Sequence, residues 1–254
     1  MSTWKKTALV RRQEILASDI YSLVLYIPEI AKQAKAGQFV TVYSRDGSRL
    51  LPRPISLCEA DGGEGTIRLV YRVVGAGTRD FSTLREGDSI EVMGPLGNGF
   101  QKRDTKAILI GGGIGIPPML QLAKELEGEI SIVLGFRDET FLWKDLETWG
   151  NVYIASEDGE TGVKGNVLDA IREYKVEGDV IYACGPTPML RAVKEYAMLH
   201  KIEAQLSLEE RMACGIGACL ACVCQSKEVD GHSHVKNKRI CKDGPVFDAE
   251  EVEL

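Results

Sequence analysis

The chain has 254 residues, of which 44% are hydrophobic and 27% charged, and its formal net charge is −6. This length is typical of about two domains, and the apolar fraction is that of a globular protein that can bury cores. The charges are mixed along the chain without a long basic run, which argues against nucleic acid or an anionic membrane as a partner.

Two stretches bear on where the protein resides. The first twelve residues lack the apolar core and cleavage site of a secretory signal peptide. The longest uncharged stretch, residues 107–123, is short for a membrane span and is interrupted by four glycines and two prolines. We therefore expect a cytoplasmic protein, in which cysteines stay reduced and available to iron.

The first hundred residues contain short apolar segments separated by turn signals. This pattern predicts strands over residues 7–16, 20–27, 38–43, 66–73 and 89–93, with turns at residues 36–37, 46–47 and 61–63. We expect an antiparallel barrel over residues 1–101.

The segment Arg53-Pro54-Ile55-Ser56 is expected to end a strand and to place a cation and a hydroxyl beside a proline of restrained φ. An arginine there can clamp a diphosphate through two hydrogen bonds, and Ser56 can donate to the edge of a flavin ring. The alternative is an arginine that is merely solvated at a strand end.

A glycine-rich turn over residues 75–82, with Gly77 and Thr78 at its centre, follows the residues Val70, Tyr71 and Arg72. We expect it to open a short helix. Glycines allow the backbone to approach a phosphate, and the exposed N–H groups of a helix start favour negative charge. An ordinary turn with Thr78 as the helix cap is the other interpretation.

From residue 106 onward, apolar runs alternate with helical patterns. Strands are predicted over residues 107–110, 130–135, 152–155 and 180–184, and helices over residues 118–126, 141–148, 166–174 and 188–200. Strand and helix in alternation predict a doubly wound parallel sheet, which we assign to residues 102–207.

A glycine-rich loop after the first parallel strand precedes a helix, which is the setting of a nucleotide diphosphate site. It departs from the strict G-x-G-x-x-G pattern, because Pro118 occupies the last glycine position, and no P-loop lysine follows. A Cys-Gly-Pro turn ends the last strand at the same edge, and its cysteine sulfur is expected to be a small buried group. The candidate nucleotide-binding residues are Gly111, Gly112, Gly113, Gly115, Cys184, Gly185 and Pro186.

Arg137 and Asp138 follow the second parallel strand, where such folds meet the adenosine ribose. A carboxylate suits a 2′-hydroxyl, whereas an arginine suits a 2′-phosphate. These two residues alone leave the choice between NAD and NADP open.

The last fifth of the chain is rich in cysteine. Cys214, Cys219 and Cys222 form a C-x4-C-x2-C pattern, and Cys241 follows after eighteen intervening residues. This spacing is that of a plant-type [2Fe-2S] cluster, in which each iron takes two thiolates. A four-thiolate zinc site or structural thiols are the alternatives, and Cys224 could replace Cys222 as a ligand. Residues 208–254 are too few to bury their own core, so we expect their order to depend on the cluster.

These motifs, together with Gly94-Pro95-Leu96-Gly97, resemble those of the ferredoxin-NADP reductase superfamily. They also follow one another along the chain in the order that is typical of that superfamily. Residues 210–219, Cys222, Cys241 and residues 243–247 are similar to the electron-transfer subunits of dihydroorotate dehydrogenase B, and this similarity runs along essentially the whole chain. The superfamily usually has an aromatic residue where Ile55 stands, so Tyr71 becomes a candidate for stacking on the flavin.

The resemblance implies an FAD-binding barrel, an NAD-binding α/β domain and a C-terminal [2Fe-2S] domain. It implies that the four cysteines of the spacing pattern hold the cluster and that Cys224 is not a ligand. It also favours NAD over NADP as the nicotinamide cofactor. The residues it assigns to FAD are Arg53, Pro54, Ile55, Ser56, Val70, Tyr71, Arg72, Gly77 and Thr78.

The resemblance also implies a partner, a separate FMN-containing subunit that oxidises dihydroorotate to orotate in pyrimidine biosynthesis, in a heterotetramer of two copies of each subunit. Electrons would pass from FMN through the cluster and FAD to NAD, with no acid–base residue needed in this chain. Met212, Ile216 and Leu220 are candidate docking contacts, unless they only shield the cluster. Alternatives are an NAD(P)-linked subunit of a sulfide dehydrogenase or of a bifurcating ferredoxin reductase, and a stand-alone reductase.

Overall fold

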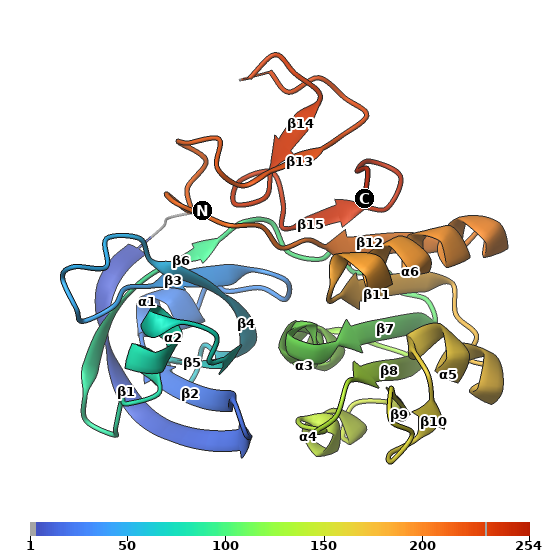
Figure 1. Ribbon diagram of the computed structural model, residues 1–254, viewed down its shortest axis with the longest axis horizontal. Coiled ribbons are helices and arrows are strands. Elements are labelled where there is room, and N and C mark those ends of the chain that lie inside the picture. The colour runs from blue at the N-terminus through green and yellow to red at the C-terminus, as the bar shows by residue number, and fades with distance from the viewer. Residues whose placement is uncertain (1–3, 232) are drawn as a thin grey trace.

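A computed structural model describes residues 4–231 and 233–254 of the protein. A barrel lies beside an α/β sheet. The cysteine-rich C-terminal part of the chain, residues 208–231 and 233–254, lies over the junction between them and is called the cysteine segment below (Figure 1). In the described ranges, no helix is both long and apolar enough to cross a lipid bilayer.

The N-terminal part is a closed antiparallel barrel, as predicted. Its strands follow one another around the barrel in the order β1-β2-β5-β4-β3-β6. Alternate side chains such as Leu23, Leu25 and Leu57 fill its interior. The strands are β1 (Trp4–Ala17), β2 (Ile20–Tyr26), β3 (Phe39–Val42), β4 (Arg53–Asp61), β5 (Thr66–Arg72) and β6 (Ser89–Leu96), with the short helices α1 (Pro28–Ala31) and α2 (Ala76–Phe81).

One expectation about the barrel is wrong. The segment from Arg53 to Ser56 begins β4 instead of ending a strand, and β4 itself was not predicted. Proline is tolerated at the start of a strand, where Pro54 pairs with Thr41 of β3.

The second part is a sheet in the order β10-β9-β8-β7-β11-β12-β15, parallel except for β15. Helices α5 and α6 share a core with Ile108 and Ile181 on one face, while α3 and α4 pack with Leu109 and Ile132 on the other. The predicted doubly wound arrangement is therefore confirmed. The elements are β7 (Ala107–Gly112), the 3-10 turn η1 (Gly113–Gly115), α3 (Pro117–Glu125), β8 (Ile130–Phe136), α4 (Trp143–Glu147), β9 (Asn151–Ser156), β10 (Val163–Lys164), α5 (Val167–Tyr174), β11 (Val180–Cys184), α6 (Thr187–His200), β12 (Glu203–Ser207) and β15 (Val246–Asp248).

Helix α3 lies between the barrel and the sheet (Figure 1). Gln121 of this helix accepts a hydrogen bond from the backbone amide of Ala60 in β4 at 2.8 Å. Farther along the junction, Arg68 of β5 donates to Asp145 of α4, also at 2.8 Å. These contacts fix the barrel against the carboxyl edge of the sheet, so the sites on the two units face a common junction.

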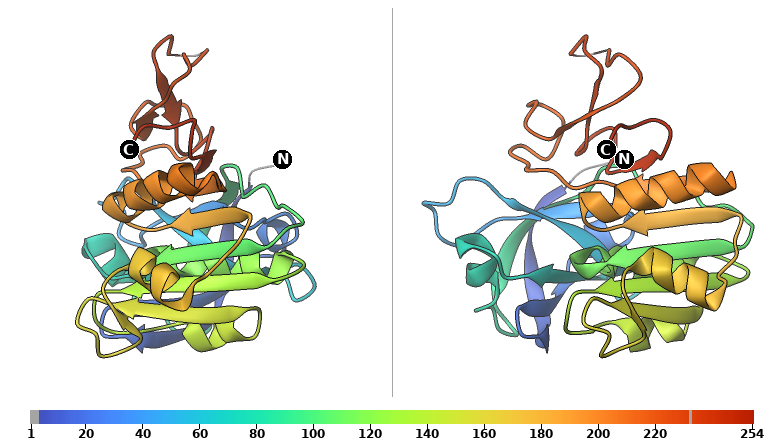
Figure 2. Two further views of the ribbon diagram at one scale, coloured as in Figure 1. Left: turned by 90° about the vertical axis from the view of Figure 1, so that its right-hand side faces the viewer. Right: turned by 45° about the vertical axis from the view of Figure 1, so that its right-hand side comes forward.

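The cysteine segment forms a small hairpin of β13 (Val223–Gln225) and β14 (Asn237–Arg239) and then adds β15 to the sheet. Figure 2 shows this segment over β12 and α6 in both views. Cys222, Ile240 and Phe247 belong to the same buried cluster as residues of α6 and β12. The segment thus shares the core of the α/β sheet, and this packing contributes to its order. That its order also depends on the cluster stays a prediction.

Candidate cofactor sites

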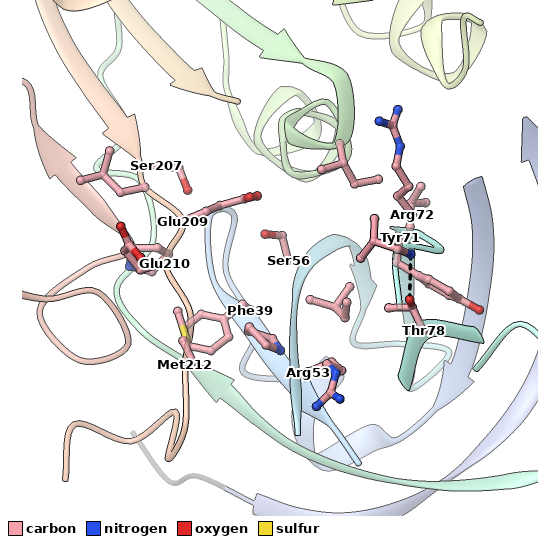
Figure 3. A pocket seen from close by; sticks show the side chains of 17 residues that line it. Phe39, Arg53, Ser56, Tyr71, Arg72, Thr78, Ser207, Glu209, Glu210 and Met212 are labelled. Carbon is pink, nitrogen blue, oxygen red and sulfur yellow. Dashed lines mark hydrogen bonds between the residues drawn. The ribbon is translucent and has the colours of Figure 1, made fainter. Parts of the chain in front are cut away.

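A cavity of about 460 Å³ opens between the barrel and the start of the cysteine segment. From the barrel side it is lined by nearly all of the residues assigned to FAD, namely Arg53, Pro54, Ile55, Ser56, Val70, Tyr71, Arg72 and Thr78. From the other side it is bounded by residues that follow β12, and Figure 3 shows Glu209 and Met212 reaching inward from there. A mixed wall of apolar and polar groups with two arginines fits a dinucleotide with a flavin ring.

Gly77 borders this cavity indirectly. A Cβ atom at Gly77 would lie 2.7 Å from Nε of Arg53, so only glycine lets the guanidinium rest against the turn. Thr78 Oγ1 accepts hydrogen bonds from the amides of Val74 and Gly75 at 3.0 and 3.2 Å. The turn therefore opens α2, as expected, with Gly75 as the N-cap residue. Thr78 is the third residue of the helix and bonds back to the Gly75 amide, so it supports the cap but is not the cap residue of the alternative interpretation.

Tyr71 does not offer its ring to a flavin. The ring stacks on Tyr21 with centroids 5.9 Å apart, meets Phe81 edge-on, and leaves Tyr71 only 2% exposed. Burial also raises the pKa of the Tyr71 hydroxyl. The expectation that Tyr71 stacks on the flavin is therefore wrong, although the residue still borders the cavity.

Glu209 is a cavity residue that the sequence interpretation missed. Its side chain extends toward Ser56 (Figure 3). The side chain is accessible from the open cavity, yet the surrounding protein displaces enough water that desolvation raises the pKa of its carboxyl. Its position just after the last parallel strand, at the carboxyl edge of the sheet, is the one signal that could have pointed to it.

A second cavity, of about 280 Å³, lies at the carboxyl edge of the parallel sheet. Gly112, Gly113 and Pro186 line it, together with Arg137 and Asp138 from the loop after β8. Arg72 lines both this cavity and the first one. The two cavities therefore meet at one side chain, as the transfer of a hydride between a flavin and a nicotinamide requires.

The other residues predicted to bind the nucleotide, which are Gly111, Gly115, Cys184 and Gly185, pack behind the residues that line this second cavity. A Cβ atom at Gly115 would lie 2.4 Å from the carbonyl oxygen of Cys184, and one at Gly185 would lie 2.5 Å from Cε of Met189. Gly111 approaches Ile116 in the same way. Cys184 is buried, and burial raises the pKa of its thiol to about 12, as expected for a small buried residue.

The four cysteines of the spacing pattern form two pairs. Sγ of Cys219 lies 3.3 Å from Sγ of Cys214, and the amide of Cys241 donates to Sγ of Cys222 at 3.4 Å. The amide of Gly217 donates to Sγ of Cys241 at 3.1 Å. Two pairs of thiols with backbone N–H groups directed at sulfur fit a [2Fe-2S] cluster, in which each iron takes two thiolates.

The surroundings favour thiolates at two of these cysteines. Burial raises the pKa of Cys214, but the amides of Cys219 and Ile216 point at its sulfur and bring the pKa down to about 7. The thiol of Cys241 donates to Cys222, which lowers the pKa of Cys222 to about 6 and raises that of Cys241. Thiolates are the form that binds metal.

Cys224 stands apart from these pairs. Its thiol donates to the carbonyl of Lys238 across the hairpin at 3.7 Å, and burial raises its pKa to about 11. Arg239 of the same hairpin is buried, donates to the carbonyl of Gly217 at 3.1 Å and pairs with Asp243. The hairpin therefore supports the ligand loop, residues 214–222, while the thiol of Cys224 bonds to the opposite strand of the hairpin.

Three families match successive parts of the chain. Residues 7–100 match the oxidoreductase FAD-binding domain, and residues 109–195 match the oxidoreductase NAD-binding domain. Residues 209–253 match the iron-sulfur cluster binding domain of dihydroorotate dehydrogenase B. These matches confirm the expected set of cofactors, which is FAD, NAD and an iron–sulfur cluster.

Two solved structures share the fold. The chain overlays on an NADH-dependent reduced ferredoxin-NADP oxidoreductase, described for flavin-based electron bifurcation, with a TM-score of 0.87 and 29% identity over 97% of this chain and 89% of that one. A ferredoxin reductase of carbazole 1,9a-dioxygenase overlays with a TM-score of 0.67 and 19% identity over 80% of this chain and 67% of that one. The second likeness shows the fold alone.

Similar sequences extend over nearly the full length. A protein of Listeria monocytogenes serotype 4a (strain HCC23) is 46% identical over 96% of this chain and 97% of its own length. One of Caldanaerobacter subterraneus subsp. tengcongensis is 43% identical over 98% of both chains. Each is named the electron transfer subunit of dihydroorotate dehydrogenase B (NAD(+)), and this chain belongs to that family.

Proposed function

We propose that this chain carries electrons from the FMN of a separate dihydroorotate-oxidising subunit, through its own [2Fe-2S] cluster and FAD, to NAD. The observation that carries this proposal is the continuity of the three sites. Residues that follow β12 bound the FAD cavity and lead directly to Cys214, and Arg72 lines both the FAD cavity and the nucleotide cavity. The order of the sites along this path is the order that the relay needs.

Each cofactor has residues suited to hold it. Arg53 would bind the FAD diphosphate, Ser56 and Thr78 would border the flavin, and Gly112 and Gly113 would let the nicotinamide dinucleotide approach the sheet edge. Cys214, Cys219, Cys222 and Cys241 would hold the cluster. When bound, the cluster supplies single-electron transfer, the flavin links single electrons to a pair, and the nicotinamide takes a hydride.

The ligand loop offers a surface for the partner subunit. Ile216 and Leu220 are 53% and 48% exposed on the loop that carries the cysteines, so their apolar side chains are available to a docked subunit. Met212, by contrast, is half-buried and lines the FAD cavity beside Phe39 (Figure 3), so we assign it to the inner wall. We infer that the FMN subunit docks on the first two residues, in a heterotetramer of two copies of each chain.

The nucleotide cavity favours NAD in this proposal. Asp138 lies in it with a carboxylate suited to a ribose 2′-hydroxyl, although Arg137 lies beside it. The related chains carry NAD(+) in their names, which supports the same choice. The KM for NADH should therefore be lower than that for NADPH, and the reverse order would contradict this part of the proposal.

A related function has one observation in its favour. The structural likeness to the bifurcating oxidoreductase covers almost the whole chain, so a subunit with the same cofactors and a different partner would have a similar fold. The sequence identity of 40–46% to the dihydroorotate dehydrogenase B subunits outweighs the 29% identity to that structure.

Anaerobic purification of the chain with its natural partners tests the proposal. We expect a red-brown protein with one FAD, and two irons and two sulfides, per chain. Mass spectrometry should find a copurifying FMN-containing subunit, and the complex of the two chains should reduce NAD with dihydroorotate. A colourless chain, a chain with zinc in place of iron, or a copurifying partner without FMN would contradict the proposal.

A further inference from the structure

Thr41 lies on β3 with its side chain directed away from the barrel interior. Its neighbours Val40 and Val42 point into the barrel core, and side chains alternate along a strand. Phe39, on the same face as Thr41, packs with the core that the α/β sheet shares with the cysteine segment. Thr41 itself is 0% exposed, so the cysteine segment and the neighbouring strands cover it completely.

The ligand loop packs directly on Thr41. Gly215, the residue after Cys214, has φ +71°, and a Cβ atom there would lie 2.9 Å from Cγ2 of Thr41. The next nearest atoms to that Cβ position are Cδ1 of Leu96 at 3.6 Å and Cε of Met93 at 3.9 Å. Only glycine allows both this backbone conformation and this approach, so the loop is seated on β3 at Thr41.

The hydroxyl of Thr41 has no protein partner. Among residues 4–231 and 233–254, its Oγ1 is the one buried side-chain nitrogen or oxygen atom that makes no hydrogen bond. Buried polar groups are almost always paired, because an unpaired one loses its hydrogen bonds to water without replacement. The Leu96 and Met93 side chains on the barrel side offer no strong acceptor.

The ligand loop that covers Thr41 carries Cys214, the residue directly before Gly215. The amides of Ile216, Ala218 and Cys219 already direct N–H bonds at Sγ of Cys214, so the loop gathers donors around a sulfur anion. On β4, the residue paired with Thr41 is Pro54, which lines the FAD cavity. Thr41 therefore stands between the ligand loop and the flavin site.

We propose that the Thr41 hydroxyl donates a hydrogen bond to the sulfur atoms of the iron–sulfur unit at Cys214 and thereby raises the reduction potential of the cluster. A donor to sulfur stabilises the reduced cluster more than the oxidised one, because the reduced cluster carries more negative charge. The bond also accounts for the unpaired hydroxyl. This inference rests on the proposed function, since it needs the cluster to be present, and it makes Thr41 a residue that sets the reduction potential of the cluster.

Redox titration of the purified FAD- and cluster-containing chain tests this role. Thr41→Val keeps the shape and removes the hydroxyl, Thr41→Ser keeps the hydroxyl, and Thr41→Ala removes it without a branched side chain beside Gly215. Met93→Leu changes the packing under the same loop and serves as the control. Cluster reduction is followed by electron paramagnetic resonance, with iron and FAD contents measured on the same samples.

We expect the reduced-to-oxidised ratio of the cluster at a fixed potential to fall about tenfold in Thr41→Val and Thr41→Ala, which is ~59 mV for a one-electron couple. Thr41→Ser and Met93→Leu should keep the wild-type potential. Unchanged potentials in Thr41→Val and Thr41→Ala, or equal shifts in Thr41→Val and Thr41→Ser, would overturn the inference while leaving the proposed function intact. A wild-type chain without a cluster would instead overturn the proposed function.

Discussion

The carboxylate of Glu139 accepts two hydrogen bonds from Ser18, one from its amide at 2.8 Å and one from its hydroxyl at 2.7 Å. Ser18 lies between β1 and β2 of the barrel, whereas Glu139 lies in the loop after β8 that carries Arg137 and Asp138. The contact thus ties the ribose side of the nucleotide cavity to the barrel that binds the flavin.

The first prediction concerns this tie. Glu139→Ala should raise the KM for NADH by roughly threefold to tenfold, the range expected for one or two lost hydrogen bonds, while FAD content stays unchanged. Steady-state reduction of a dye by NADH measures the KM. Because the bonds from the Ser18 amide and hydroxyl lower the pKa of the Glu139 carboxyl, the tie is complete at neutral pH and weakens only as the pH falls below the ordinary glutamate range.

Glu127→Ala is the matched control for this variant, since it removes an exposed carboxylate from the turn before β8. Its KM should equal that of the wild type. An unchanged KM in Glu139→Ala, or a KM that rises equally in both variants, would show that the tie does not position the loop.

The second prediction concerns the contact between Gly77 and Arg53. Gly77→Ala should lower the affinity for FAD at least about tenfold, because the new methyl group would displace the guanidinium from the cavity wall. Gly75→Ala is the control, since nothing lies within 4 Å of its Cβ position and its backbone is extended. Isothermal titration with FAD after its removal measures both, and equal affinities in the two variants would remove Arg53 from the binding site.

The third prediction concerns Glu209 and pH. Desolvation raises the pKa of its carboxyl, so the folded protein holds that proton more tightly than the unfolded chain does. The charged carboxylate therefore costs stability, and this cost appears as the pH rises above the ordinary glutamate pKa. Glu209→Gln should melt about 1–3 °C above the wild type at pH 8, with a smaller difference at pH 5.5.

Glu210→Gln provides the comparison, because Glu210 lines the same cavity one residue later. Thermal unfolding followed by flavin fluorescence measures both variants across this pH range. A gain in Glu209→Gln that stays constant with pH, or that Glu210→Gln shows equally, would mean that desolvation of the Glu209 carboxylate is not its source.

Much of the architecture could be predicted from local patterns in the sequence. Runs such as residues 107–110 and 180–184 are apolar on both faces, which is typical of strands buried in a parallel sheet. Strand β4 was not predicted because it begins with Arg53-Pro54, and the restricted φ of proline suggested the end of a strand. Strand β15 was not predicted because it has only three residues and forms by pairing with β12, about forty residues earlier in the chain.

The same distinction, between local sequence patterns and contacts with distant segments, holds for the residues of the candidate sites. Arg53, Thr78 and the four cysteines of the spacing pattern could be singled out as candidates because their neighbours in sequence supply the glycines, proline and spacing that the chemistry needs. Thr41 and Glu209 could not be found, because their roles depend on which distant segment covers them. The stacking role expected for Tyr71 was wrong for the same reason, since Tyr21 of β2 covers its ring.

The pairing of Cys214 with Cys219 leads to the fourth prediction. Cys219→Ser should lose the cluster, because it removes one of two paired thiols that would bind the same iron, whereas Cys224→Ser should keep it. Iron content and the visible spectrum measure the outcome. Retained FAD in both variants is expected, since neither cysteine lines the FAD cavity.

The most direct test of the relay is dihydroorotate-dependent reduction of NAD by the complex of this chain with the FMN subunit, compared between wild type and Cys219→Ser with FAD retained. Reduction of a dye by NADH should survive in the variant, because it needs only the FAD and nucleotide sites. The linked reaction should fall to background, because in the proposed relay the cluster is the path between the FMN of the partner and the FAD of this chain. Dihydroorotate-dependent NAD reduction at the full wild-type rate without the cluster would contradict the account.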